Sequence, residues 1–155
     1  LIEQPASHVA VGGEEFDVPP APGRSTKQLR KSQDLPVADA NRGATVAAAF
    51  GRVVGARSGD KGGDANLGVW ARRDEVYDWL VGFLTTERLR LLLPETAGLE
   101  VERYLLPNLK AVNFLLRGYL GDGVSSSNKL DPQAKALWEY LRAKVVEIPE
   151  KLLAV

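Results

Sequence analysis

Residues 56–72 read ARSGDKGGDANLGVWAR, and this stretch predicts how the folded part of the chain begins. Its second half places Leu67, Val69 and Ala71 on one side of the chain, with the two-residue period of a strand. The preceding segment, AAAFGRVVGAR, suits a buried strand. We therefore expect two strands joined by a glycine-rich loop over residues 58–66, either as a hairpin or across a wider gap.

The expected loop collects polar and charged side chains among glycines. The residues concerned, with the arginine before the loop, are Arg57, Ser58, Gly59, Asp60, Lys61, Gly62, Gly63, Asp64 and Asn66. Glycine lets backbone N–H groups approach a ligand closely, and successive exposed N–H groups bind anions. Because Arg57 and Lys61 lie among these glycines, a phosphate or carboxylate is a suitable ligand. The spacing does not match the phosphate loop of nucleotide hydrolases, since Asp60 stands between Gly59 and Lys61.

Three other interpretations of the loop remain open. Asp60, Asp64 and Asn66 offer oxygen ligands to a hard cation, although their spacing is not that of a calcium loop. Asp60, Lys61 or Asp64 could transfer protons if neighbours shift their pKa values. The loop could also be a turn in which Asp and Asn cap their own backbone. We favour an anion site with no metal, because a plain hairpin connection needs only about two to five residues.

Composition excludes several other kinds of chemistry. The chain has no cysteine, and its single histidine, His8, lies in a segment that resembles a tail. Disulfides, thiol nucleophiles, thiolate metal sites and a Ser-His-Asp triad in the folded part are therefore excluded. The 20 Lys and Arg balance the 20 Asp and Glu, which argues against a nucleic-acid binder. No segment has the apolar length of a membrane span or the pattern of a secretory signal, so we expect a cytoplasmic protein.

The chain divides into a tail and one folded domain. Residues 1–48 are rich in Pro, Gly, Ser and charge, and we expect a linker or the tail of a preceding domain there. HVAV could form a short strand, whereas residues 14–45 should carry little regular structure. Residues 49–150 form the predicted domain. Because the sequence contains no methionine, we expect residue 1 not to be a native start.

Helices and strands alternate along the predicted domain. After residue 72 we expect a helix capped by Asp74, a short helix capped by Thr85 or Thr86, and a strand at LEVERYLL. NLKAVNFLLRGYLG fits either a helix or a buried strand, and we favour the helix. A helix capped by Asp131 follows, with Pro132 first and Leu137 and Leu141 in the core, and VVEIP is expected to form a last strand. Asn108 and Asn113 flank apolar residues and are further ligand-binding candidates, unless they act as caps or turn formers. The pattern predicts an α+β two-layer sandwich, ferredoxin-like, with helices packed on a small, mostly antiparallel sheet.

Several separate blocks of the sequence resemble a known family. ARSGDKGGDANLGVWAR, YDWL, LLPE, RYLLPNLKAVNFLLRGYLGDGVSSS and LDPQAKAL are together similar to the acyclic terpene utilisation (AtuA-like) family, specifically its C-terminal ferredoxin-fold domain. The resemblance covers residues 51–141. Trp138 departs from it, since the family pattern has a small residue there.

The resemblance implies a partner and a class of substrate. It implies a larger AtuA-like core domain or enzyme subunit, bacterial catabolism of acyclic terpenes, and coenzyme A thioesters as substrates, while it names no cofactor and no catalytic residue. The first hypothesis is a C-terminal domain or small subunit acting on branched acyl-CoA or carboxylate compounds, with its site at residues 57–66 and at Asn108 or Asn113. The alternative is a non-catalytic assembly module for a larger enzyme such as an acyl-CoA carboxylase. A homo-oligomer fits either hypothesis, whereas nucleic acid and membrane are not expected as partners.

Overall fold

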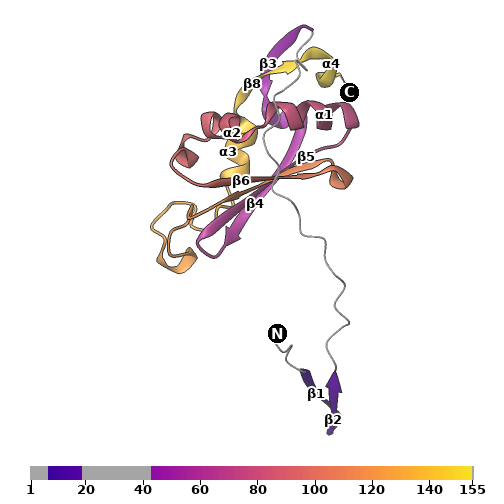
Figure 1. The fold of residues 1–155 in the computed structure, drawn as a ribbon, viewed down its shortest axis with the longest axis vertical. Helices are drawn as coiled ribbons and strands as arrows, with labels where there is room; N and C mark the ends of the chain where they lie inside the picture. The colour runs from indigo at the N-terminus through magenta and orange to yellow at the C-terminus, as the bar shows by residue number, and fades with distance from the viewer. Residues whose placement is uncertain (1–6, 19–42, 155) are drawn as a thin grey trace.

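A four-stranded antiparallel sheet forms the centre of the fold, in the computed structural model that describes residues 7–18 and 43–154 (Figure 1). Its strands, in spatial order, are β4 (Val54–Lys61), β5 (Asp64–Ala71), β7 (Ala111–Leu116) and β6 (Val101–Leu106). β5 and β6 run parallel to each other on either side of β7, and the chain between them is helical. This split β-α-β arrangement is the centre of a ferredoxin-like fold and confirms the predicted class.

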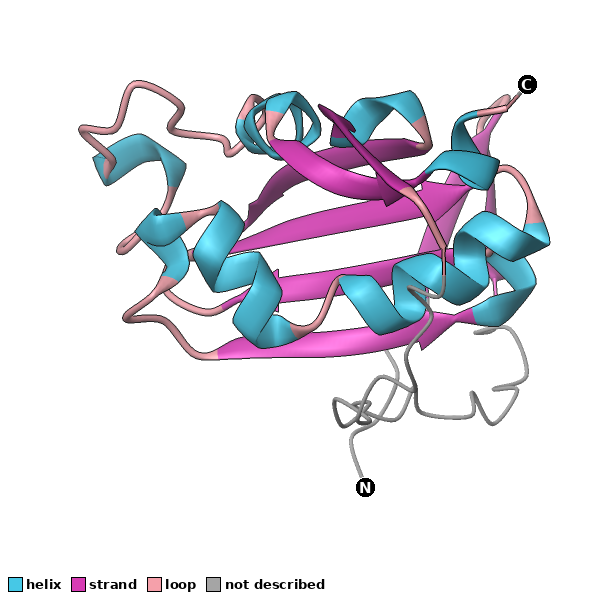
Figure 2. Ribbon diagram, turned by 90° about the horizontal axis from the view of Figure 1, so that it is seen from above, coloured by secondary structure: helices cyan, strands magenta, loops and turns pink. Residues whose placement is uncertain are grey.

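The helices lie on one side of this sheet (Figure 1). They are α1 (Asp74–Phe83) and α2 (Thr86–Leu92) between β5 and β6, and α3 (Leu137–Ala143) after β7. Seen from that side, they lie in front of the strands (Figure 2). Short 3₁₀ turns occur at η1 (Phe50–Arg52), η2 (Pro94–Thr96), η3 (Pro107–Leu109) and η4 (Val124–Ser126). The sheet face opposite the helices is called the open face below.

Two short antiparallel pairs complete the described elements. β1 (Ser7–Val11) pairs with β2 (Glu14–Val18), which confirms the strand expected at HVAV and corrects the expectation of little structure for residues 14–18. β3 (Thr45–Ala49) pairs with β8 (Val145–Pro149), and α4 (Glu150–Leu153) follows. Most of the expected linker, residues 19–42, lies outside the described residues. The division of the chain at residue 48 stays a prediction, and β3 runs across that point.

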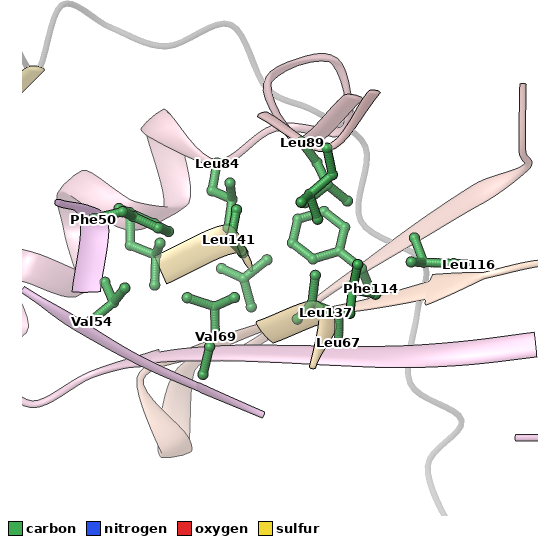
Figure 3. Packing of buried hydrophobic residues seen from close by; sticks show 14 of the residues in the cluster. Phe50, Val54, Leu67, Val69, Leu84, Leu89, Phe114, Leu116, Leu137 and Leu141 are labelled. Atoms are coloured by element: carbon green, nitrogen blue, oxygen red, sulfur yellow. The ribbon is translucent and has the colours of Figure 1, made fainter. Parts of the chain in front are cut away.

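The core fills the space between the sheet and the helices. In β5 every second residue is buried, so Leu67 and Val69 face the helices, as the two-residue period predicted. Phe114 from β7 and Leu141 from α3 are completely buried in the same cluster (Figure 3). Apart from Glu102 and Ala111, the buried residues of the four strands face the helices, and the alternate positions lie on the open face.

The segment NLKAVNFLLRGYLG forms a strand instead of the expected helix. Val112, Phe114 and Leu116 in β7 alternate toward the core, which is a strand period. Leu115, on the opposite face, made the apolar run look continuous and hid that alternation. As a consequence, Asn113 belongs to the open face of the sheet.

Helix starts agree with the prediction in one case of three. Thr85 caps α2, accepting a hydrogen bond from the Arg88 N–H at 3.1 Å, as predicted. Asp74 is instead the first residue of α1, where its carboxylate pairs with Lys110 at 2.9 Å.

The third helix begins later than the Asp131-Pro132 pair predicted. Ala134 adopts a left-handed conformation (φ 51°) that an α-helix cannot contain, so α3 starts only at Leu137. Asp131 accepts hydrogen bonds from the N–H groups of Lys135 and Ala136 at 2.8 and 2.7 Å. It therefore stabilises the turn that leads into the helix, while Leu137 and Leu141 are buried as expected.

Candidate functional site

The expected loop over residues 58–66 is the end of a β-hairpin. β4 continues to Lys61 and β5 begins at Asp64, so only Gly62 and Gly63 form the turn. Lys61 lies directly opposite Asp64, and the glycine-rich segments remain paired in full register. The length of the connection is therefore no argument for a binding loop, because this turn has the usual size of a hairpin connection.

The turn glycines have a structural role. Gly62 adopts φ 66°, which suits a residue without a Cβ. The carbonyl oxygen of Gly63 accepts a hydrogen bond from the Leu120 N–H at 2.8 Å, and a Cβ on Gly63 would overlap the carbonyl oxygen of Gly121. These contacts fix the hairpin turn against the segment that follows β7.

Strand alternation divides the predicted site residues between the two sheet faces. Arg57, Gly59, Lys61, Asp64 and Asn66 share the open face. Asp60 belongs to the side that carries the helices. The three candidate catalytic residues Asp60, Lys61 and Asp64 are therefore not brought together.

Ser58 points toward the helices and is only 7% exposed. Its hydroxyl donates to the Ala134 carbonyl at 2.5 Å and accepts from the Trp138 N–H at 3.1 Å. The predicted ligand-binding serine thus connects β4 to the first turn of α3, and we leave it out of the proposed site.

A charged network occupies one end of the open face. Arg117, just after β7, pairs with Asp64 of β5 at 2.7 Å and with Glu102 of β6 at 2.8 Å. The second oxygen of Asp64 accepts from the Gly118 N–H at 2.8 Å, and the Tyr104 hydroxyl donates to Glu102. Both carboxylates of this network therefore have cationic or hydrogen-bonding partners within the chain.

Two asparagines meet at the middle of the open face. The side-chain amide of Asn113 donates to the Asn66 side-chain oxygen at 2.9 Å, across β7 and β5. Gly68, which lies opposite Asn113 and Arg57, has room for a Cβ, since the nearest atom would be Asn113 Oδ1 at 3.5 Å. Asn108 is instead exposed in η3, at the other end of the strands, so the structure does not bring it to this group.

Two cations on the open face have no charged partner among the described residues. Arg57 and Lys61 of β4 are exposed, and neither makes an ion pair or a side-chain hydrogen bond with any residue in the described part of the chain. A Cβ on Gly59, which lies between them, would have no atom within 4 Å. The open face thus presents two available positive charges on either side of a glycine.

The contacts in the network move the pKa values of Asp64, Tyr104 and Arg117 further from neutral pH. The Gly118 N–H and the Arg117 guanidinium hold the pKa of Asp64 below its ordinary value of 3.8. The hydrogen bond to Glu102 raises the pKa of Tyr104 above its ordinary value of 10, and the two carboxylates raise the pKa of Arg117. A general acid or base works best with a pKa near the operating pH, so these three groups suit binding better than proton transfer.

Three members of this network were not predicted as site residues, namely Glu102, Tyr104 and Arg117. Glu102 and Tyr104 occupy alternate positions of a strand that was predicted correctly, so their shared face could have been inferred. The helix expected at NLKAVNFLLRGYLG concealed that Arg117 follows a strand beside them. In the described residues, no group of three or more His, Cys, Asp or Glu is placed to hold a metal ion.

Comparisons with known proteins define the family. The sequence model of the family described as AtuA ferredoxin-like domain matches residues 49–147. No curated protein and no solved structure matches the chain. Of the helices in residues 7–18 and 43–154, none is long and apolar enough to cross a membrane. Because the match covers more than half of the sequence, the chain belongs to the AtuA ferredoxin-like domain family.

Proposed function

We propose that this domain binds the anionic group of a branched carboxylate or of its coenzyme A thioester. In this proposal it is the C-terminal domain or small subunit of an AtuA-like protein in the catabolism of acyclic terpenes. Membership of the AtuA family supports the protein context. The binding role rests on the open face of the sheet.

One observation carries the proposal. Arg57 and Lys61 are exposed on the open face without partners among the described residues, next to Gly59 and Gly68, which leave space above the strands. Guanidinium and ammonium groups form charge-assisted hydrogen bonds with carboxylates and phosphates. The Asn66–Asn113 amide pair adds neutral hydrogen-bonding groups beside them.

The nearby acidic residue does not neutralise this cationic surface. Asp64 lies opposite Lys61, but its two oxygens are engaged by Arg117 and by the Gly118 N–H. Lys61 therefore remains available to a ligand. Because the pKa of Asp64 is lowered, its carboxylate stays ionised and does not donate a proton near neutral pH. We therefore assign acid–base chemistry to a partner domain or subunit.

Isothermal titration calorimetry of the full 155-residue chain with isovalerate and isovaleryl-CoA tests the proposal. The variants Arg57→Gln and Lys61→Gln should each weaken binding by about tenfold, since a hydrogen bond to a charged group contributes roughly 1.5–3 kcal/mol. Lys135→Gln removes an equally exposed positive charge from the segment before α3 and should bind like the wild type. Equal affinity of all three variants, or no binding by the wild type, would contradict the proposal.

A second function is favoured by the apolar end of the open face. Trp70 is 39% exposed, and it lies in one cross-strand row with Ala111 and Leu106. Such a surface suits a docking role in a larger enzyme or in a homo-oligomer. Trp70→Asp should then lower the molar mass of a self-associating chain in light scattering, whereas an unchanged monomer in both proteins would contradict self-association.

A further inference from the structure

A pocket of about 420 Å³ lies where β4 begins, between the open face and α3. Its volume lies within the range of small-molecule sites, roughly 300–1,000 Å³. Among the described residues that line it are four arginines and two tryptophans and no acidic residue: Arg52, Arg57, Arg72, Arg142, Trp70 and Trp138. Of these six, the anion site proposed above uses only Arg57.

Two glycines allow the walls of this pocket to form. A Cβ on Gly55 would overlap the Trp70 indole, so the missing side chain lets the ring lie against β4. A Cβ on Gly51 would lie 2.8 Å from Arg142 Nε, so this glycine lets the guanidinium lie against the backbone. The Trp70 wall therefore depends on Gly55 in β4, and the Arg142 wall depends on Gly51 just before β4.

The guanidinium of Arg142 is held in place without an ion pair to any residue in 7–18 or 43–154. It lies 5.5 Å from the centre of the Trp138 ring and donates to the Gly51 carbonyl oxygen at 3.2 Å. Its Nε is buried against Gly51 and has no hydrogen-bond partner in the part of the chain that the structure describes. Arg52 and Arg72 are exposed and pair with no carboxylate in the part of the chain that the structure describes.

We propose that this pocket binds a nucleotide that carries two or more phosphate groups. Guanidinium groups match phosphate oxygens in paired hydrogen bonds, and four of them would repel one another without an anionic ligand. The two indoles offer flat apolar surfaces for a nucleobase. A nucleotide supplies both the anion and the ring.

The charge balance favours a single nucleotide over a nucleic-acid strand. The chain carries 20 basic and 20 acidic residues, whereas proteins that bind nucleic acid strands show a basic excess. The arginines concentrate in one pocket of about 420 Å³, which limits the ligand to the size of a small molecule. This inference does not depend on the proposed function.

Tryptophan fluorescence of the full chain, titrated with ADP, pyrophosphate, adenosine and a thymidine decamer, tests the proposal. Trp70 and Trp138 line the pocket while Trp79 is buried in the core, so ADP should change the emission. ADP should bind at least about tenfold tighter than pyrophosphate or adenosine. Equal affinity for ADP and pyrophosphate, tighter binding of the decamer, or no binding of ADP would overturn the nucleotide assignment.

Variants locate the site. Arg142→Gln and Arg72→Gln should each weaken ADP binding by about tenfold. Arg72 is exposed and pairs with no described residue, so its variant stays informative even if Arg142→Gln unfolds. Arg88→Gln on α2 removes the same charge outside the pocket and should retain ADP affinity within about twofold. Unchanged ADP affinity in Arg72→Gln would overturn the site, whereas loss of isovalerate binding in Lys61→Gln bears only on the proposed function.

Discussion

Ser58 connects the sheet to α3, and removing its hydroxyl should cost stability and leave ligand binding intact. In the folded protein the hydroxyl donates to the Ala134 carbonyl and accepts from the Trp138 N–H. Trp138 lies in the first turn of α3, where N–H groups have no partner within the helix. Ser58 therefore caps a helix that begins 79 residues later in the sequence.

The expected loss in Ser58→Ala is worked from these two bonds. Ser58 is 7% exposed, so water cannot replace the hydroxyl fully. A buried polar group left without a partner costs about 1–3 kcal/mol, and loss of a serine cap costs about 0.5–2 kcal/mol. We expect the free energy of unfolding to fall by about 1–3 kcal/mol.

Urea denaturation followed by circular dichroism measures this change. Ser125→Ala is the matched control, because Ser125 is exposed and makes no hydrogen bond to a described residue, and its effect should stay within about 0.5 kcal/mol. Hydrogen exchange at the Trp138 amide should also accelerate in Ser58→Ala. If Ser58→Ala is as stable as the control, the connection between β4 and α3 has no energetic weight and the reasoning is wrong.

Three further predictions follow from packing, backbone approach and charge. Leu141 is completely buried, so Leu141→Ala should lose about 2–5 kcal/mol of stability in chemical denaturation, and a loss below about 1 kcal/mol would place it outside the core. Gly63→Ala should lose about 1–3 kcal/mol in the same assay because its Cβ would overlap the Gly121 carbonyl, whereas Gly59→Ala, with open space around it, should be neutral or stabilising. Because the pKa of Asp64 is lowered in the folded state, its ionised carboxylate stabilises the fold above pH 3.8, and this stabilisation is lost as the pH falls further. The free energy of unfolding of Asp64→Asn should therefore fall less steeply with acidification than that of the wild type, and an equally steep fall would refute this.

Local periodicity predicted much of the fold. The alternation around Leu67 and Val69 identified β5, and Thr85 identified the start of α2. Both signals depend on residues close in sequence, so they can be recognised without knowing the tertiary contacts. The helix predicted around Asn113 was wrong, because apolar residues on both faces of β7 hid the alternation that distinguishes a strand from a helix.

The candidate site was predicted in part, and the residues that were wrongly included or overlooked have a common cause. Glycine and polar residues suggested a loop at 58–66, yet strand pairing imposed by the hairpin register made this segment part of the sheet. Arg57, Lys61 and Asn66 do share a surface, but Ser58 and Asp60 belong to the other face. Contacts such as Arg117 with Asp64 join residues far apart in sequence, and spacing along the chain carries no signal for them.

We propose above that the open face around Gly68 binds an anionic ligand. NMR titration of the ¹⁵N-labelled chain with isovalerate tests it most directly, because backbone and side-chain amide signals locate the ligand residue by residue. We predict that the largest shifts occur at the Arg57 and Lys61 backbone amides and at the side-chain amides of Asn66 and Asn113. Shifts confined to β3 and β8, or no shift at saturating isovalerate, would contradict the claim.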